Sequence, residues 1–277
     1  MEFWKMHGLG NDFIFLDHFS LNSGAFNYPE LARQLCHRQF GVGGDGLILV
    51  LPSAVAAARM RIFNSDGSEA EMCGNGIRCF ARFIFEKGYT RANPLTVETL
   101  AGVVTLKLCF EGDRISAVNV DMGQPVLKPQ DIPVNILRGP VTGASLEVAG
   151  LSLQYSAVSM GNPHCLVFWE DFSTLDLARL GPAIENHPLF PKKTNVEFIR
   201  VDSPGEITLK VWERGAGPTL ACGTGACAAV VASVLNGLTE RAVTVHLPGG
   251  DLQIEWNEDN HVYMTGPAVY TFRGVLL

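Results

Sequence analysis

The sequence of 277 residues has no excess of basic side chains, because 21 Lys and Arg stand against 28 Asp and Glu. Nucleic acid and anionic membranes are bound by basic surfaces, so this balance argues against both partners. The longest mainly apolar run, 226–235, has about ten residues, and a membrane helix needs about 20. The first residues show neither the basic nor the apolar segment of a secretory signal. We therefore expect a cytoplasmic protein.

The seven cysteines include no C-x-x-C pair, and the seven histidines form no H-E-x-x-H motif. These absences disfavour a zinc ribbon, a thioredoxin-type site and a zinc protease. An odd number of cysteines spread over a long chain also does not resemble a disulfide framework. Hydrophobic residues make up 47% of the chain, which is enough for one large or two medium folded domains.

Short alternating or apolar runs dominate the chain and are typical of β-strands. Helical periodicity is rarer and is bounded by proline at helix starts and glycine at helix ends. The predicted helices are 29–38, the run from Cys73 to Gly88, 175–186 and 223–236. The predicted strands are 13–16, 47–51, 59–63, 95–98, 103–110, 115–120, 153–158, 165–169, 196–201, 207–212, 242–246 and 252–256. Residues 123–150 are rich in proline and small residues, so we place a domain crossover there.

The two halves of the chain repeat one pattern. A Gly-Asn pair ends at Asn11 in the first half and at Asn162 in the second. Cys73 follows Asn11 by 62 residues, and Cys222 follows Asn162 by 60 residues. Each cysteine begins a Cys-Gly-x-Gly sequence, and each helix-like run after it ends at a glycine 15 residues later. These matched offsets indicate an internal duplication that gives two similar lobes.

A Cys-Gly-x-Gly turn at a helix start can hold both an anion and a reactive sulfur. The glycines let a ligand approach the first N–H groups of the helix, which favour a carboxylate. The same groups favour a thiolate, so we expect the pKa of each cysteine to fall from its usual range toward neutrality. If the two lobes face each other, one sulfur can remove a proton from a carbon while the other protonates the opposite face. This chemistry inverts a stereocentre without a metal or a pyridoxal cofactor.

Other readings of the same residues are weaker. Five cysteines without the glycine context are interpreted as small buried apolar residues: Cys36, Cys79, Cys109, Cys165 and Cys227. Residues 41–46 match G-x-G-x-x-G, but a helix-like segment precedes them and a strand follows. A dinucleotide site needs the opposite order, so we reject it.

Several segments in order along the chain together resemble the diaminopimelate epimerase family. They are 6–13 (MHGLGNDF), 63–69 (FNSDGSE), 72–76 (MCGNG), 160–164 (MGNPH), 194–196 (TNV), 212–215 (WERG), 221–225 (ACGTG), 247–250 (LPGG) and 264–266 (MTG). The resemblance implies an α/β (α+β) fold of two pseudo-symmetric, strand-rich lobes, each wrapped around a central helix, with the active site in the interlobe cleft. The implied lobes are 1–120 plus 267–277, with Cys73, and 121–266, with Cys222.

The resemblance also implies the activity. Such an enzyme interconverts LL- and meso-2,6-diaminopimelate, serves lysine and peptidoglycan precursor biosynthesis, uses no cofactor and forms a homodimer. Cys73 and Cys222 would be the acid/base pair, and His164 and Glu213 would tune the thiols. The implied substrate-binding positions are Asn11, Asn64, Gly74, Asn75, Asn162, Asn195, Glu213, Arg214, Gly223 and Thr224. The distal half of the substrate is zwitterionic, which suits a guanidinium and amide oxygens.

Three positions depart from the family pattern: Gly46 replaces a glutamine found in some members, Pro218 a glutamate, and Lys193 an arginine. We hypothesise that such a pocket could admit other amino acids. A racemase of proline, hydroxyproline or glutamate on the same fold is therefore the main alternative. A thiol oxidoreductase and a non-catalytic binding module are remoter alternatives, and a Cys-His protease is disfavoured because it needs only one cysteine.

Overall fold

The computed structural model describes residues 1–19, 26–136 and 139–276. The chain divides into two compact units, Met1–Asp121 with Thr265–Leu277, and Met122–Met264. Leu277, the end of the predicted returning segment, lies outside the described residues, as do 137–138 within the predicted crossover. Among the described residues, none of the helices combines the length and the apolar character that a bilayer crossing requires.

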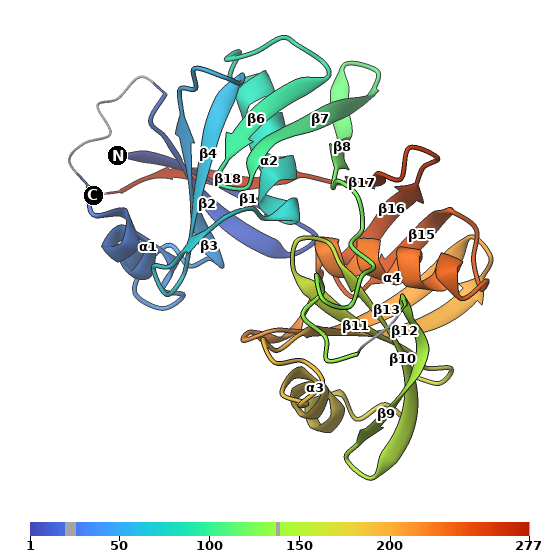
Figure 1. Cartoon of the computed structure of the whole chain (residues 1–277). Helices are drawn as coiled ribbons and strands as arrows, with labels where there is room; N and C mark the ends of the chain where they lie inside the picture. The colour runs from blue at the N-terminus through green and yellow to red at the C-terminus, as the bar shows by residue number, and fades with distance from the viewer. Residues whose placement is uncertain (20–25, 137–138, 277) are drawn as a thin grey trace. The chain divides into compact units, whose positions relative to one another are not determined.

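Unit 1 is a strand-rich fold with two helices. The strands β2 and β3 run parallel, and β1 and β4 flank them in antiparallel register. The last strand pairs with β1, so both ends of the chain lie side by side (Figure 1). The elements are β1 (Glu2–Gly8), β2 (Asn11–Asp17), α1 (Tyr28–Cys36), β3 (Gly46–Leu51), β4 (Ala58–Asn64), β5 (Glu69–Ala70), α2 (Gly74–Glu86), β6 (Leu95–Thr99), β7 (Gly102–Glu111), β8 (Arg114–Asp121) and β18 (Val269–Val275).

Unit 2 repeats this arrangement. The strands β11 and β12 run parallel, and β10 and β13 flank them in antiparallel register. The elements are β9 (Val141–Val148), β10 (Leu151–Ser159), β11 (Pro163–Phe168), α3 (Leu177–Glu185), β12 (Asn195–Ser203), β13 (Glu206–Glu213), β14 (Gly217–Thr219), α4 (Gly223–Leu235), β15 (Ala242–Leu247), β16 (Gly250–Trp256) and β17 (Val262–Gly266), the last of which crosses the boundary between the units.

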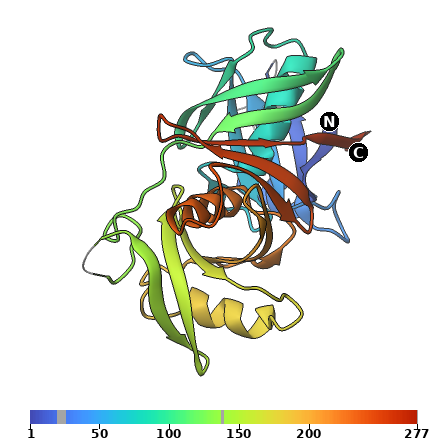
Figure 2. The same cartoon turned by 90° about the vertical axis from the view of Figure 1, so that its right-hand side faces the viewer.

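Each unit has one central helix. Ten of the 13 residues of α2 are buried, and the helix contacts β1, β2, β7 and β8. The helix α4 also has ten buried residues, most of them alanine, valine or glycine. A helix that is apolar on all sides must be covered on all sides, and Figure 2 shows α4 enclosed by the strands of its unit with α3 outside.

The two central helices end in the same way. Gly88 and Gly237 both have positive φ angles, 79° and 70°. The N–H of Gly88 donates to Phe85 O, and the N–H of Gly237 donates to Val234 O, each at 3.0 Å. Glycine adopts this left-handed conformation without strain, which explains why both predicted helices stop there.

The fold class predicted from the sequence is confirmed, because the structure is a strand-rich α+β fold. The four predicted helices are present within two residues of their predicted bounds. The strands β1, β5, β9, β14, β17 and β18 were not predicted. The strand β9 lies inside the segment that its prolines and small residues marked as a crossover. β9 pairs in antiparallel register with β10, and the strand propensity of its own residues does not indicate this pairing.

Candidate active site

Cys73 lies at the N-cap of α2, in extended conformation (φ −141°, ψ 118°). Its Sγ lies 3.7 Å from Asn11 Oδ1, which also accepts a hydrogen bond from Asn75 Nδ2 at 3.2 Å. The Nδ2 of Asn11 donates to Asp45 Oδ2 at 2.7 Å, so the amide is fixed at both ends. Asn11 and Asp45, both far from Cys73 in the sequence, therefore meet at the start of α2.

A buried arginine supports this turn and was not predicted. Arg78 has no exposed surface, and its guanidinium donates to Gly74 O at 3.0 Å and Asn75 Oδ1 at 2.9 Å. Its Nε donates to Pro267 O at 3.2 Å, which ties the returning C-terminal segment to the cysteine turn. The only available signal was an arginine within an apolar helix face, and a sequence pattern cannot distinguish such a residue from an exposed one. We call Asn11, Asp45, Cys73, Asn75 and Arg78 the Cys73 half-site.

An ion-pair network lies behind Asp45. Arg38 lies 2.7 Å from Asp45 and 2.8 Å from Asp12, and Asp12 lies 2.6 Å from Lys5. Burial alone would raise the pKa of Asp12, but hydrogen bonds and charge from Arg38 and Lys5 outweigh it and lower that pKa. The network therefore fixes the side chain of Asp45, which in turn fixes the amide of Asn11.

Asn64 and Gly46 stand opposite each other on β4 and β3. The exposed amide of Asn64 donates to Ser68 Oγ at 3.0 Å. A Cβ at Gly46 would lie 2.9 Å from the carbonyl oxygen of Phe63, so this backbone does not accommodate a side chain there. The local packing of β3 and β4 therefore requires glycine at position 46.

Cys222 lies at the N-cap of α4, with φ −118° and ψ 112°. The N–H of Gly225 donates to Cys222 Sγ at 3.4 Å, and Thr224 Oγ1 lies 3.5 Å from the sulfur. The thiol is almost fully buried, at 6% exposure. The turn itself matches the one at Cys73, and its glycine N–H does point at the sulfur as the helix start predicts.

The expected lowering of the pKa is nevertheless wrong for Cys222. Burial, followed by the charges of Glu213 and Glu197, raises its pKa well above the usual range. The bonds from Thr224 and Gly225 act in the opposite direction and are outweighed. The helix start alone is therefore not sufficient to lower the pKa of this thiol.

His164 is fully buried on β11 and is held at both ring nitrogens. Its Nδ1 lies 2.7 Å from Glu197 Oε1, and its Nε2 lies 3.0 Å from Asn162 Oδ1. Glu213, at the end of β13, accepts a hydrogen bond from Thr219 at 2.6 Å. We call Asn162, His164, Glu197, Glu213, Cys222 and Thr224 the Cys222 half-site. Glu197 was not predicted, because a glutamate in a strand is usually exposed.

Asn195 and Arg214 lie together in unit 2. The buried Asn195 amide donates to Pro163 O and accepts the backbone N–H of Arg214, both at 2.9 Å. Asn195 thus fixes the two turns that carry Asn162 and Arg214. The Arg214 guanidinium is exposed and donates to Lys192 O at 3.2 Å, which leaves most of its donors for a ligand.

The other cysteines are free thiols in this structure, and four of them are buried: Cys36, Cys79, Cys165 and Cys227. Burial raises the pKa of Cys36 to about 11 and that of Cys79 to about 12. Cys109 is partly exposed. Within the described ranges, no three His, Cys, Asp or Glu side chains are grouped to hold a metal ion.

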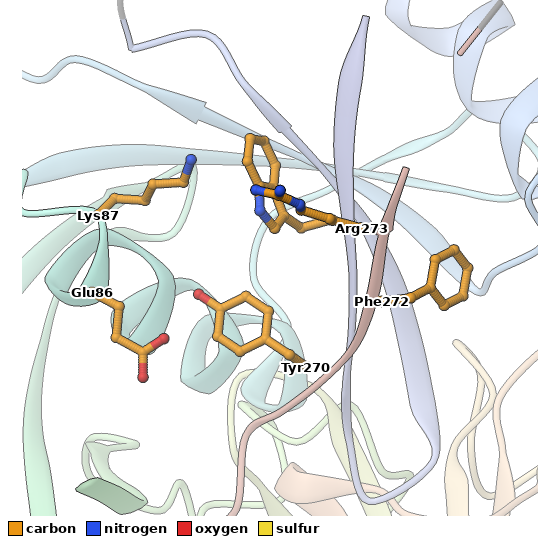
Figure 3. A pocket seen from close by; sticks show the side chains of 6 residues that line it. Glu86, Lys87, Tyr270, Phe272 and Arg273 are labelled. Atoms are coloured by element: carbon orange, nitrogen blue, oxygen red, sulfur yellow. The ribbon is translucent and has the colours of Figure 1, made fainter. Parts of the chain in front are cut away.

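A separate cavity of about 360 Å³ lies at the other end of α2 from Cys73. Glu86 and Lys87 come from the end of the helix, and Tyr270, Phe272 and Arg273 from β18 (Figure 3). The Lys87 ammonium lies 3.7 Å from the ring centre of Trp4, which also lines the cavity. Neither cysteine of the two half-sites lines this cavity.

Known proteins match the whole chain. The diaminopimelate epimerase family profile matches residues 3–128 and 156–271. A diaminopimelate epimerase from Desulfitobacterium hafniense is 70% identical over 100% of this chain and 98% of its own length. One from Moorella thermoacetica is 56% identical over 99% of this chain and 98% of its own length.

A solved structure shares the fold. The probable proline racemase from Agrobacterium radiobacter K84 is 16% identical, with a TM-score of 0.71 over 100% of this chain and 92% of that chain. At this identity the likeness concerns the fold alone. The sequence matches are far closer and cover both cysteine turns, so the chain belongs to the diaminopimelate epimerase family.

Proposed function

We propose that this chain is an isomerase that interconverts LL- and meso-2,6-diaminopimelate by two-base proton transfer between Cys73 and Cys222. The observation that carries the proposal is that each cysteine caps a 13-residue central helix, at matching places of two similar units. Membership of the diaminopimelate epimerase family supports the substrate. The proposal requires both sulfurs to reach one α-carbon, from opposite sides.

The reaction needs one thiolate and one thiol. The thiolate takes the α-proton, and the thiol gives its proton to the opposite face of the carbanion, so the negative charge passes from one sulfur to the other. Because burial and two carboxylates raise the pKa of Cys222, we assign the resting proton to this sulfur. Cys73 is then the first base, and the roles exchange in the reverse direction.

The first N–H groups of the two helices hold the substrate carboxylate and the charge that develops on it. The first N–H groups of a helix have no acceptor within the helix and carry its positive dipole end. Gly74, Asn75, Gly223 and Thr224 supply these groups in the two units. Donors aimed at developing charge in a water-poor site are the largest single source of such rate enhancement.

The distal end of the substrate selects diaminopimelate. It carries one carboxylate and one ammonium, so it needs a cation and neutral oxygens. We assign the carboxylate to Arg214 and the ammonium to amide or carbonyl oxygens from Asn64, Asn162 and Asn195. His164 and Glu213 adjust the ionisation of the thiols. Proline lacks a second polar end and would leave these groups unpaired, which disfavours it.

A kinetic comparison tests the substrate. We expect turnover of LL-diaminopimelate and at least 100-fold lower kcat/KM for proline and glutamate, a gap typical of polar groups left unpaired. The assay is run without pyridoxal phosphate and repeated after metal chelation, with unchanged rates expected. Turnover of proline but not of diaminopimelate would favour the racemase alternative and overturn the substrate assignment.

We also propose that the protein is a cytoplasmic homodimer. The resemblance supports this, and β18 exposes apolar side chains, with Phe272 at 48% and Val275 at 63%. Apolar groups gathered on one strand are a common basis for self-association. Light scattering after size exclusion is expected to give twice the mass of 30.0 kDa, and a mass of one chain would contradict the proposal.

A further inference from the structure

We propose that Glu197 is a positioning residue of the epimerisation, which fixes the ring of His164 behind the Cys222 turn. The inference rests on the proposed function. The family resemblance assigned no role to this residue.

The position of Glu197 is the first observation. It lies on β12 with no exposed surface, and its Oε1 lies 2.7 Å from the Nδ1 of the equally buried His164. The other nitrogen of His164 lies 3.0 Å from Asn162 Oδ1. A chain of three polar side chains therefore runs from the interior of unit 2 to the partly exposed Asn162, a predicted substrate contact.

The packing against α4 is the second observation. A Cβ built on Gly225 would lie 2.5 Å from Glu197 Oε1 and 3.2 Å from Cys222 Sγ. The carboxylate thus lies against the first turn of α4, next to the glycine whose N–H donates to the sulfur. The second glycine of the Cys-Gly-x-Gly motif is required here to make room for a carboxylate.

The corresponding place in unit 1 holds hydrocarbon. The register pairs Phe13 with Gly46 on β2 and β3, and His164 with Asn195 on β11 and β12. Ile48, two residues after Gly46, therefore corresponds to Glu197. Its Cδ1 would lie 3.0 Å from a Cβ on Gly76, just as Glu197 would meet one on Gly225. The fold accepts Phe and Ile in these two places.

This comparison separates function from folding. Burying ionisable groups is expensive, and replacing a buried pair by hydrocarbon is often neutral or stabilising. One carboxylate oxygen, Glu197 Oε2, is buried without a hydrogen-bond partner among the described residues, which adds to the cost. Apolar side chains fill the corresponding positions in unit 1. Packing alone therefore does not require the His164–Glu197 pair in unit 2, and we infer that the pair has a function.

That reason is the orientation of His164. A carboxylate that accepts the Nδ1–H of a histidine fixes both its tautomer and its ring plane. In this tautomer Nε2 is unprotonated and accepts from the side-chain amide of Asn162, whose oxygen and nitrogen exchange places by a flip, on the side of the predicted substrate contacts. Three titratable groups surround Cys222 in unit 2: Glu213 from β13, Glu197 from β12 and, bonded to Glu197, His164 from β11. Charge from Glu197 also raises the pKa of Cys222, which keeps the proton on this sulfur.

The test compares Glu197→Gln with Ser233→Ala in the full-length protein. Ser233 is a fully buried polar residue on α4 whose hydroxyl donates to Ala229 O and makes no other described hydrogen bond, so it controls for lost stability. We expect Glu197→Gln to lower kcat for LL-diaminopimelate about 10–100-fold, as for other outer partners of a functional histidine, with KM within about twofold. Ser233→Ala should keep both constants within about twofold of the wild type. A kcat for Glu197→Gln within twofold of the wild type would overturn the proposal.

A spectroscopic readout does not depend on the variant folding. Nitrogen-15 NMR of the imidazoles in the wild type, assigned with His164→Gln, should show a proton on Nδ1 of His164. A ring without that proton would overturn the proposal, as would a folded Glu197→Gln whose activity falls while the His164 resonance is unchanged. If the wild type leaves LL-diaminopimelate unchanged, the proposed function fails, whereas this resonance still tests the position of His164.

Discussion

The two half-sites share one backbone and differ in what lies behind the sulfur. Both cysteines cap a central helix of the same length, and both helices end at a positive-φ glycine. In unit 1, Phe13 and Ile48 hold the corresponding places in the interior, and Asn11 Oδ1 lies 3.7 Å from Cys73 Sγ. Behind Cys222, His164 and Glu197 occupy the corresponding places. The two turns have similar backbones, and their electrostatic surroundings differ.

The difference teaches that a helix start does not by itself set the ionisation of a thiol. The N–H of Gly225 does point at Cys222, but burial and two carboxylates act more strongly in the opposite direction. The surroundings of the sulfur, and not the turn alone, therefore decide the pKa of Cys222.

Removing either sulfur tests whether the two halves act together. We expect Cys73→Ala and Cys222→Ala each to lower kcat by on the order of 10²–10⁴-fold, the usual contribution of general acid/base catalysis. Because both sulfurs act in one step, the double variant should lose little more than either single variant. If the kcat loss of the double variant equals the product of the two single losses, the two sulfurs do not act in a shared step.

Adding one methyl group to each turn sharpens the comparison. A Cβ on Gly225 would lie 2.5 Å from the bonded Glu197 carboxylate, whereas one on Gly76 would meet the movable end of Ile48 at 3.0 Å. We expect Gly225→Ala to lower the free energy of unfolding by about 1–3 kcal/mol. Gly76→Ala should change it by less than about 1 kcal/mol, because better helix propensity offsets the contact. Urea unfolding measures both values, and equal losses would show that the two turns are packed alike.

Competition between the thiols for an alkylating agent compares the two sulfurs within one molecule. Alkylation needs the thiolate, and the pKa of Cys222 is raised, so its fraction of thiolate is small below that pKa and grows as pH rises. At pH 8 we expect Cys73 to react on the order of tenfold faster than Cys222, and the gap to narrow at higher pH. Peptide mass spectrometry after limited iodoacetamide treatment gives the ratio. Faster reaction at Cys222 would reverse the assignment of the resting acid.

The smallest effect concerns acid stability of unit 1. The pKa of Asp12 is lowered in the folded state, so its contribution is present above its unfolded pKa and is lost as pH falls through the folded value. Below about pH 4, we expect Asp12→Asn and the wild type to converge in stability, with the wild type ahead by about 1 kcal/mol at pH 7. Denaturant midpoints between pH 3 and 7 measure this. A constant difference over that range would exclude Asp12 as the titrating group.

Much of the fold followed from local patterns. The apolar run from Ile77 to Ile84 with Gly88 as its stop predicted α2, and matched offsets from Cys73 and Cys222 predicted the repeat. The strand β18 was missed because it pairs with β1, at the opposite end of the chain. No local pattern reports a partner that distant.

The site was predictable in residue type and less so in environment. Asn11 and Cys73 meet as their motifs predicted, but the support by Arg78 and Glu197 depends on burial that a sequence does not show. The raised pKa of Cys222 follows from the same burial. Sequence motifs thus predict the reacting groups, while the residues behind them required the packed structure.

The most direct test of a two-base mechanism is the fate of solvent deuterium at early times. In deuterated water, product formed from LL-diaminopimelate should carry deuterium at the inverted carbon, because the second sulfur delivers a solvent-derived deuteron. Recovered substrate should still carry hydrogen there. Product that retains the original hydrogen, or deuterium entering substrate as fast as product, would indicate a single base and contradict the account.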